Sequence, residues 1–299
     1  MSRFDVGDPY GTEILAGNYV RILGPVDVLA KGVPVPLARR KQRLLLALLA
    51  LDAGRPVPFS RIVSVLWPLK APAAVRNQVH VHIYALRRAL AAITSAGKCL
   101  ETRHDGYVLN APVVEVDLCR FEQAVADSER ALAAGHLPEA HRTLSAALDL
   151  WHGRPLDGLD GLDGVFAQSE SARLQERRLT ALERRLDLDL AVGRHADALA
   201  ELAGLVAANP LHQGFQRRHV LALYCCERTS QALAACRAAR RLVVDELGID
   251  AGERLDSLEM AILRGVPAEG LVAEAIGWEG PRVRPLRRAA GHARYGSGL

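Results

Sequence analysis

The side chains best suited to chemistry lie between Ala73 and Leu100, a stretch of the sequence that contains no acidic residue. Apolar residues recur here at the spacing of one helical face and predict an amphipathic helix over residues 73–92. This core-facing set is Val79, Ile83, Leu86 and Leu90. The opposite face of the same helix contains Asn77, Val81, Tyr84 and Arg88.

The outer face of this helix combines the residue types that recognise base pairs. An Asn amide can bond adenine, an Arg can bond guanine or phosphate, and a Val can touch the methyl group of thymine. We therefore interpret this face as a reader of double-stranded DNA, with a solvated basic helix as the alternative. His80 and His82 stand two residues apart and point away from each other, so they offer no metal pair, and we predict no metal or cofactor.

The neighbouring elements must cover the apolar face of this helix. Three short extended runs between residues 19 and 37 predict a small antiparallel sheet. A leucine-rich helix follows over residues 40–52, and Ser60 is suited to cap a short second helix. Residues 100–109 read as a hairpin that turns at Asp105-Gly106. Sheet, three helices and hairpin is the order of a winged helix-turn-helix.

From Val116 onward the sequence shows helical periodicity and no strand signal. Helices are predicted over about 117–134, 137–152, 165–192, 195–208, 211–227, 230–247 and 251–263. Their pairing at intervals of roughly 34–40 residues is typical of degenerate tetratricopeptide-like hairpins. The predicted fold class is mainly α, with an α+β winged helix-turn-helix before an all-α tetratricopeptide-like domain. The predicted segments are a loose leader (1–18), the winged helix (19–112), the helical domain (117–264) and a disordered basic tail (265–299).

Charge is distributed unevenly along the 299 residues. Residues 1–115 contain 15 Lys and Arg against 8 Asp and Glu, whereas residues 116–265 contain 18 against 23. This split favours a polyanion-binding module joined to a module for protein contacts, with chance scatter of surface charge as the alternative. Five cysteines without a C-x-x-C motif favour a reducing compartment. Neither a signal peptide nor an 18-residue apolar run is visible, so we expect a cytoplasmic protein that does not contact a membrane.

Two other function classes compete with DNA binding. An enzyme is disfavoured because G-x-S-x-G, H-E-x-x-H and Rossmann motifs are absent, and an aromatic content of 5% is low for a substrate pocket. A helical-repeat protein-interaction scaffold without DNA binding would explain residues 117–264 but not the basic winged helix. A salt-dependent gel shift on promoter DNA distinguishes these interpretations.

Several collinear motifs resemble known families of regulators. Residues 79–90 resemble the recognition helix of OmpR/PhoB-type winged-helix domains, and residues 100–107 resemble the wing. A closer resemblance is to the Streptomyces antibiotic regulatory proteins, and residues 41–49 and Leu66-Trp67 are among the motifs that match this family. Leu150-Trp151-His152-Gly153 and Val244–Ile249 resemble the bacterial transcriptional activation domain of that family. The resemblance covers about residues 19–264.

This resemblance implies a transcriptional activator of a secondary-metabolite (antibiotic) gene cluster. Such proteins bind direct repeats in double-stranded DNA as homodimers and recruit RNA polymerase with its sigma factor, which implies a cytoplasmic, nucleoid-associated protein.

The resemblance also implies roles for individual residues. Base contacts are expected from Asn77, Val81, Tyr84 and Arg88, backbone contacts from Arg61, Trp67, Arg76, His80, His82 and Arg87, and a wing contact from Arg103. The family usually has Arg at the position of Ala85 and a small polar residue at that of Tyr84. We therefore expect a base preference that differs from the usual one.

Overall fold

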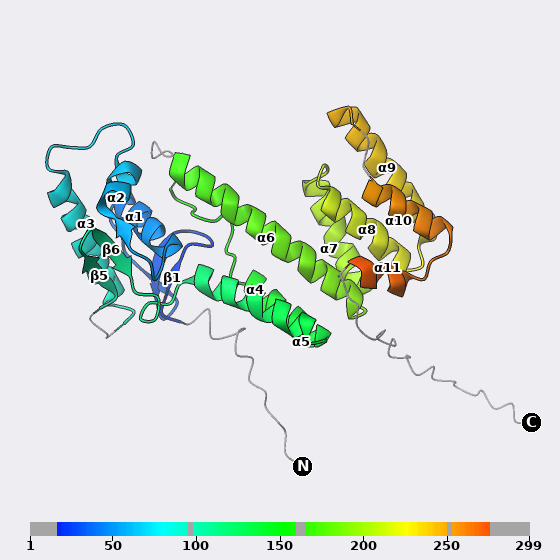
Figure 1. Ribbon diagram of the computed structural model, residues 1–299, viewed down its shortest axis with the longest axis horizontal. Coiled ribbons are helices and arrows are strands. Elements are labelled where there is room, and N and C mark those ends of the chain that lie inside the picture. The colour runs from blue at the N-terminus through cyan, green and yellow to red at the C-terminus, as the bar shows by residue number, and fades with distance from the viewer. Residues whose placement is uncertain (1–16, 95–97, 160–164, 250–252, 276–299) are drawn as a thin grey trace, which may run out of the picture. The chain divides into compact units, whose positions relative to one another are not determined.

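The computed structural model describes residues 17–94, 98–159, 165–249 and 253–275 (Figure 1). Its first element is an antiparallel sheet of three short strands in the order β1-β2-β3. The strands are β1 (Tyr19–Arg21), β2 (Asp27–Ala30) and β3 (Val33–Val35). The sheet agrees with the extended runs in the sequence. The predicted leader lies mostly outside the described residues.

Three helices and a second sheet follow. The helices are α1 (Arg40–Leu51), α2 (Phe59–Leu66) and α3 (Val75–Leu90). The strands are β4 (Val57–Pro58), β5 (Leu100–Arg103) and β6 (Gly106–Leu109), in the order β4-β6-β5. This arrangement confirms the predicted winged helix-turn-helix.

The winged helix has a core of aliphatic side chains. Most of the leucines of α1 are buried, and they face the apolar side of α3, where Val79 and Leu86 are fully buried. Ser60 does not cap α2. The helix begins at Phe59, one residue before Ser60, and its N-cap is Pro58 in extended conformation. Gly106 starts β6 where any Cβ would lie 2.0 Å from the carbonyl oxygen of Val57, so only glycine allows β4 and β6 to pair here.

The rest of the described chain is helical, as predicted. The helices are α4 (Asp117–Ala133), α5 (Leu137–Leu148), α6 (Val165–Ala191), α7 (His195–Ala208), α8 (Gln213–Cys225), α9 (Thr229–Leu247), α10 (Glu253–Leu263) and α11 (Ala268–Ala275). Consecutive helices pack in pairs, notably α4 with α5, α7 with α8 and α8 with α9. This packing is typical of helical repeats.

The helix α11 corrects the predicted tail. Residues 265–299 were expected to be disordered, but Ala268–Ala275 form a helix that packs on α8 through buried Leu271 and Val272. The Tyr224 hydroxyl donates a hydrogen bond of 2.9 Å to the carbonyl oxygen of Val266 and fixes the chain just before this helix. Two apolar residues are too few to show a helical period in the sequence. Residues 276–299 lie outside the described residues.

The described chain divides into two compact units, up to Arg185 and from Leu186 onward. In the first unit, Arg177 pairs with Glu122 and Arg184 pairs with Glu129. Both pairs advance by seven residues on each helix, so α4 and α6 run in the same direction. In the second unit, Arg218 of α8 forms a buried bidentate ion pair with Asp187 of α6, at 2.9 and 2.6 Å.

The predicted boundary between residues 112 and 117 lies inside the first unit, where backbone hydrogen bonds cross it. The amide of Val20 donates to the carbonyl oxygen of Glu115 at 2.8 Å. The amides of Ile22 and Leu23 donate to the carboxylate of Asp117, the first residue of α4, at 2.8 to 3.0 Å. The end of β1 is therefore attached to the start of α4.

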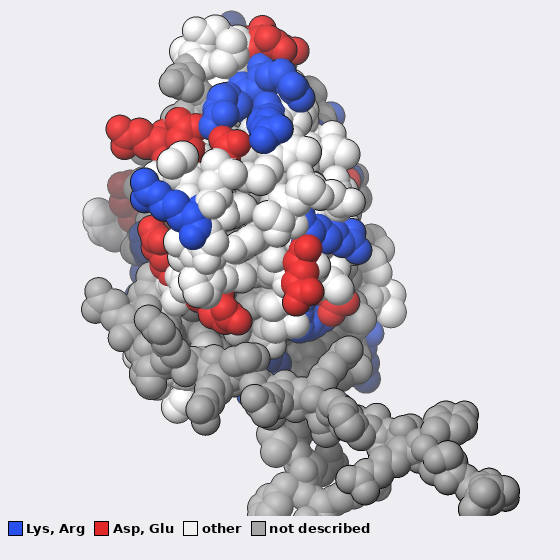
Figure 2. Space-filling model, turned by 90° about the vertical axis from the view of Figure 1, so that its right-hand side faces the viewer, with Lys and Arg blue, Asp and Glu red and all other residues white. Residues whose placement is uncertain are grey.

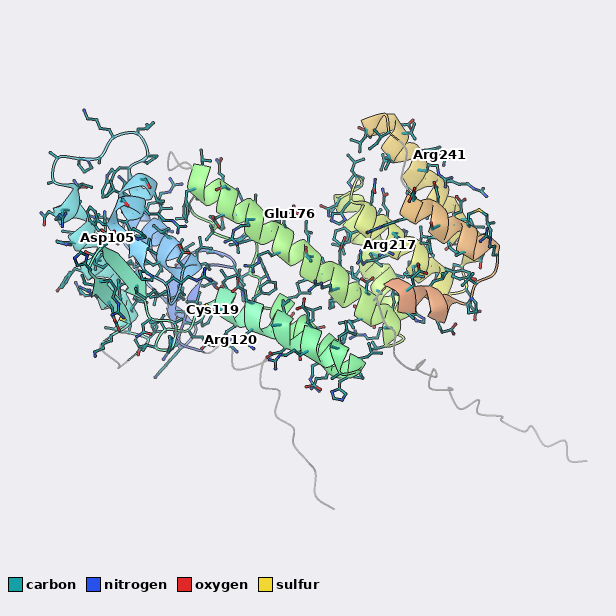
Figure 3. The ribbon with its side chains drawn as sticks, viewed as in Figure 1. Asp105, Cys119, Arg120, Glu176, Arg217 and Arg241 are labelled. Carbon is teal, nitrogen blue, oxygen red and sulfur yellow. The ribbon has the colours of Figure 1, made fainter. Side chains whose placement is uncertain are left out.

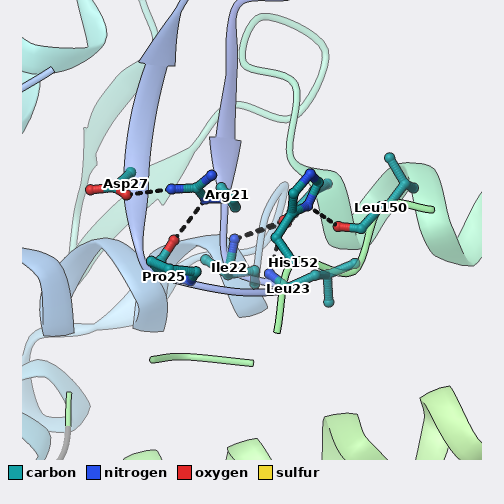
Figure 4. A network of polar contacts seen from close by, with 8 residues as sticks. Arg21, Ile22, Leu23, Pro25, Asp27, Leu150 and His152 are labelled. Carbon is teal, nitrogen blue, oxygen red and sulfur yellow. Dashed lines mark hydrogen bonds and ion pairs between the residues drawn. The ribbon is translucent and has the colours of Figure 1, made fainter. Parts of the chain in front are cut away.

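The loop after α5 approaches the same end of β1 (Figure 4). The amide of His152 donates to the carbonyl oxygen of Leu23 at 2.9 Å, and the amide of Leu156 donates to that of Ile22 at 3.0 Å. A Cβ on Gly24 would lie 2.6 Å from the carbonyl oxygen of His152, so the two backbones are in direct contact. We call the bonds that residues 20–24 form with residues 115–117 and 152–157 the β1 junction.

Candidate nucleic-acid interface

The structure brings the four candidate base-reading residues together on the exposed side of α3. Asn77 and Arg88 are exposed, and the side chains of Val81 and Tyr84 are 48% and 65% exposed. Both residues therefore present apolar surface to solvent. The face can therefore enter a groove without rearrangement of the helix.

The electrostatics of the winged helix favour an anionic partner. Residues 53–100 include no Asp or Glu, and none of α1, α2 and α3 has an acidic residue in its first turn. Helix N-termini have a partial positive charge, which acidic side chains in the first turn usually balance. Here the charge is left to attract an external anion.

One flank of α3 faces the wing, the β5–β6 hairpin. The Arg87 guanidinium donates to the carbonyl oxygen of Leu100 at 3.0 Å and to the Thr102 hydroxyl at 2.9 Å, so it ties α3 to β5. Arg76 lies 5.2 Å from the ring centre of Phe59. His80, also on this flank, is exposed. All three predicted contacts on this flank are thus at the surface.

Tyr107 of β6 also lies near this flank. Burial raises the pKa of the Tyr107 hydroxyl, while nearby Arg87 and Arg76 act to lower it. Asp105 lies in the turn of the wing (Figure 3), and its carbonyl oxygen accepts a 2.7 Å bond from the amide of Phe59. The wing is therefore held against the beginning of α2 as well as against α3.

Two of the predicted DNA contacts are engaged in ion pairs. Arg61 of α2 pairs with Asp52 at 2.8 Å, and Arg103 of the wing pairs with Glu101 at 2.7 Å. The Arg103 side chain remains 58% exposed. The two carboxylates are less accessible, since the Asp52 and Glu101 side chains are 21% and 24% exposed, so both arginines reach the surface while they hold a partly buried partner.

The other flank of α3 corrects one prediction. His82 was expected to contact the DNA backbone, but it is 5% exposed, because α1 and Trp67 at the end of α2 cover it. The His82 and Trp67 ring centres lie 6.3 Å apart. Burial, and then the charges of Arg39 and Lys41, lower the pKa of His82 and keep its ring neutral near pH 7. We therefore exclude His82 from the surface contacts.

Lys41 is the residue that sequence reasoning missed on this flank. Its Nζ lies 4.4 Å from the ring centre of half-buried Trp67, within the range of a cation–π contact. The helical period of α3 cannot reveal a cation that comes from α1. The only signal in the sequence was the basic run that begins at Arg39.

The surface of the second unit has a different character. Figure 2 shows a face with a broad neutral area and with basic and acidic side chains close to each other. Arg240 of α9, for example, pairs with both Asp256 and Glu259 of α10. Neither sign of charge dominates this face, in contrast to the winged helix.

No group of three or more His, Cys, Asp or Glu is placed to hold a metal ion in the part of the chain that the structure describes. Over the same residues, every helix is too short or too polar to cross a lipid bilayer.

Comparison with known proteins agrees with this architecture. Residues 32–109 match the family described as "Transcriptional regulatory protein, C terminal", and residues 116–263 match "Bacterial transcriptional activator domain". Regulatory protein DnrI of Streptomyces peucetius is 36% identical, over 83% of this chain and 93% of the relative. Regulatory protein AfsR of Streptomyces coelicolor is 37% identical, over 83% of this chain but 24% of the relative.

A solved structure also resembles this chain. It is that of Mycobacterium tuberculosis EmbR in complex with a low affinity phosphopeptide, with a TM-score of 0.79 and 31% identity. The similarity covers 87% of this chain and 69% of the EmbR chain. The chain belongs to the Streptomyces antibiotic regulatory protein family and is a DNA-binding transcriptional activator.

Proposed function

We propose that α3 lies in the major groove of double-stranded DNA and presents Asn77, Val81, Tyr84 and Arg88 to the base edges. The observation that supports this most directly is the exposed, acid-free face of α3. The major groove is about 12 Å wide and admits one α-helix. Ala85 stands where the family usually has an arginine. Tyr84 and Arg88 therefore become, together with Asn77, the main candidates for specific contacts.

The surrounding cations contact the DNA backbone in this proposal. Arg76, His80 and Arg87 lie on the wing-side flank, and Arg61 and Trp67 lie at α2. Arg103 extends from the wing toward the minor groove after it exchanges Glu101 for a phosphate. These contacts fix the position of the protein on the duplex but do not select a sequence.

The wider role that we propose is the one that membership of the family supports. The protein binds direct repeats near the promoter of a secondary-metabolite (antibiotic) gene cluster, as a homodimer on DNA, and recruits RNA polymerase with its sigma factor. It acts in the cytoplasm at the nucleoid and has no enzymatic activity. The second unit supports the recruiting role because its surface, with both signs of charge, suits protein contacts better than phosphates.

Fluorescence anisotropy with labelled promoter DNA from the neighbouring gene cluster tests this proposal. We expect tight binding to the operator, with an affinity that falls steeply as salt increases. Asn77→Ala should relax the preference at one base position by about 1–3 kcal/mol, measured with single-base operator variants. Gln78→Ala, which removes the neighbouring exposed amide, is the matched control and should leave the preference unchanged. A folded protein without salt-dependent binding would contradict the proposal.

A further inference from the structure

The two flanks of α3 differ in charge. Two of its arginines, Arg76 and Arg87, lie on the wing-side flank, and Arg88 lies on the exposed face. The other flank presents Gln78 and Ala85 and covers the buried, neutral His82, so it has no cation of its own. A helix in the major groove runs between two phosphate backbones, and one of them would then lack a cation from α3.

The neighbouring helix α1 places positive charge on this neutral flank. Lys41, in the first turn of α1, lies over the face of the Trp67 ring at 4.4 Å, and Trp67 in turn lies beside His82. Arg39 is exposed at the N-cap of α1, and this first turn contains no acidic residue. The Trp67 contact places Lys41 close to this flank, and Arg39 precedes Lys41 by two residues.

We propose that Lys41, supported by the Trp67 ring, binds a phosphate of the DNA strand opposite the wing, with Arg39 beside it. The inference rests on the proposed position of α3 in the major groove. His82 lies beside Trp67 and is too deeply buried to touch DNA. The ligand is a backbone phosphate, so the contact adds affinity without selecting a sequence.

The chemistry of the site suits this role. An ammonium group over an aromatic face keeps N–H donors directed away from the ring, where a phosphate oxygen can accept them. The ring also restricts the flexible lysine side chain before DNA arrives, which lowers the entropic cost of the contact. A protonated His82 would repel the Lys41 ammonium group, and the neutral imidazole beside Trp67 avoids this repulsion.

The test uses the full chain with Lys41→Met, which keeps an unbranched apolar side chain on Trp67 but removes the charge. We expect the slope of log affinity against log salt to fall by about 0.9, equivalent to roughly eightfold weaker binding at 0.1 M salt. Operator and random DNA should be affected equally. Lys41→Arg should restore most of the slope. Lys31→Met, in the exposed turn between β2 and β3, removes the same charge elsewhere and should bind like the wild type.

The outcomes separate this inference from the proposed function. If the wild type binds DNA with a steep salt dependence and Lys41→Met keeps the same slope, Lys41 binds no phosphate and only this inference fails. A loss for Lys41→Met that is confined to one base position would also overturn it. If the wild type shows no salt dependence, the proposed function itself fails. If thermal melting shows that Lys41→Met does not fold, Arg39→Gln at the exposed N-cap of α1 is tested in its place. An unchanged slope of log affinity against log salt for that variant overturns the inference.

Discussion

In the proposed complex, the Glu101 carboxylate of the wing competes with DNA for Arg103. The pair measures 2.7 Å, with the Arg103 side chain 58% and the Glu101 side chain 24% exposed. We expect Glu101→Gln to tighten DNA binding by up to about fivefold, because a surface pair is worth up to about 1 kcal/mol. The glutamine can still accept the bond from the Asn110 amide, so the wing should keep its structure. The test is to titrate DNA with Glu101→Gln and with the double variant that combines Glu101→Gln and Arg103→Gln, and to follow the anisotropy. Tighter binding that persists in the double variant would contradict the prediction.

Asp117 should make stability depend on pH. Burial raises the pKa of its carboxyl to about 7, although backbone N–H donors, first that of Leu23, act to lower it. Because this pKa is higher in the folded than in the unfolded protein, the folded state binds the proton more tightly. Stability from this group should therefore increase as pH falls from about 8 to about 5, by at most about 1.4 kcal/mol per pH unit.

Chemical denaturation of the wild type and Asp117→Asn across this pH range measures the effect. Asn does not titrate, so the stability of the wild type relative to the variant should increase toward low pH. The variant also leaves one amide of the β1 junction without an acceptor, at a cost of about 1–3 kcal/mol. A constant difference between pH 5 and 8 would show that the carboxyl does not change its protonation in this range.

At the scale of elements, the wing depends on Arg87. The guanidinium joins α3 to β5 through two hydrogen bonds, so Arg87→Ala should both remove a phosphate contact and loosen the hairpin. We expect weaker binding to all sequences and faster amide hydrogen exchange in β5. Thr102→Val removes only one of the two bonds and no charge, and should have a smaller effect on both. Equal effects of the two variants would show that the charge of Arg87 is unimportant for binding.

The long helices could be predicted from their periodicity alone. The helices α1, α3, α4 and α6 have enough turns for apolar residues to define a face, whereas β4 has two residues and α11 has eight. Pairing with β6 specifies β4, and contact with α8 specifies α11. Both depend on residues distant in sequence and leave no local signal.

The candidate site shows the same division. The exposed face of α3 could be predicted, because a helical wheel depends only on residues of that helix. The burial of His82 could not, since it depends on Trp67 at the end of α2, and the position of Lys41 over the Trp67 ring depends on α1 in the same way. The periodicity of one helix therefore predicts which of its faces is exposed, but not which side chains neighbouring helices place beside that face.

At the scale of the molecule, the winged helix is hydrogen-bonded to the chain that follows it. A fragment of residues 1–112 lacks the partners that the β1 junction provides for the amides of Val20, Ile22 and Leu23. We expect this fragment to be several kcal/mol less stable than residues 1–193, because the junction contains several hydrogen bonds and each contributes about 0.5–1.5 kcal/mol. Denaturation of both fragments tests this expectation. Equal midpoints would show that the winged helix folds without the junction.

The β1 junction also constrains where an operator can lie relative to its promoter. Backbone hydrogen bonds fix α4 and the loop after α5 to the end of β1. In a bound protein, the start of the helical domain therefore cannot rotate freely relative to the winged helix on the DNA. The helical domain would then project from one face of the duplex, set by the operator's rotational phase. Five inserted base pairs, about half a turn, should abolish activation without reducing occupancy, and insertion of a full turn of about 10.5 base pairs should restore part of it.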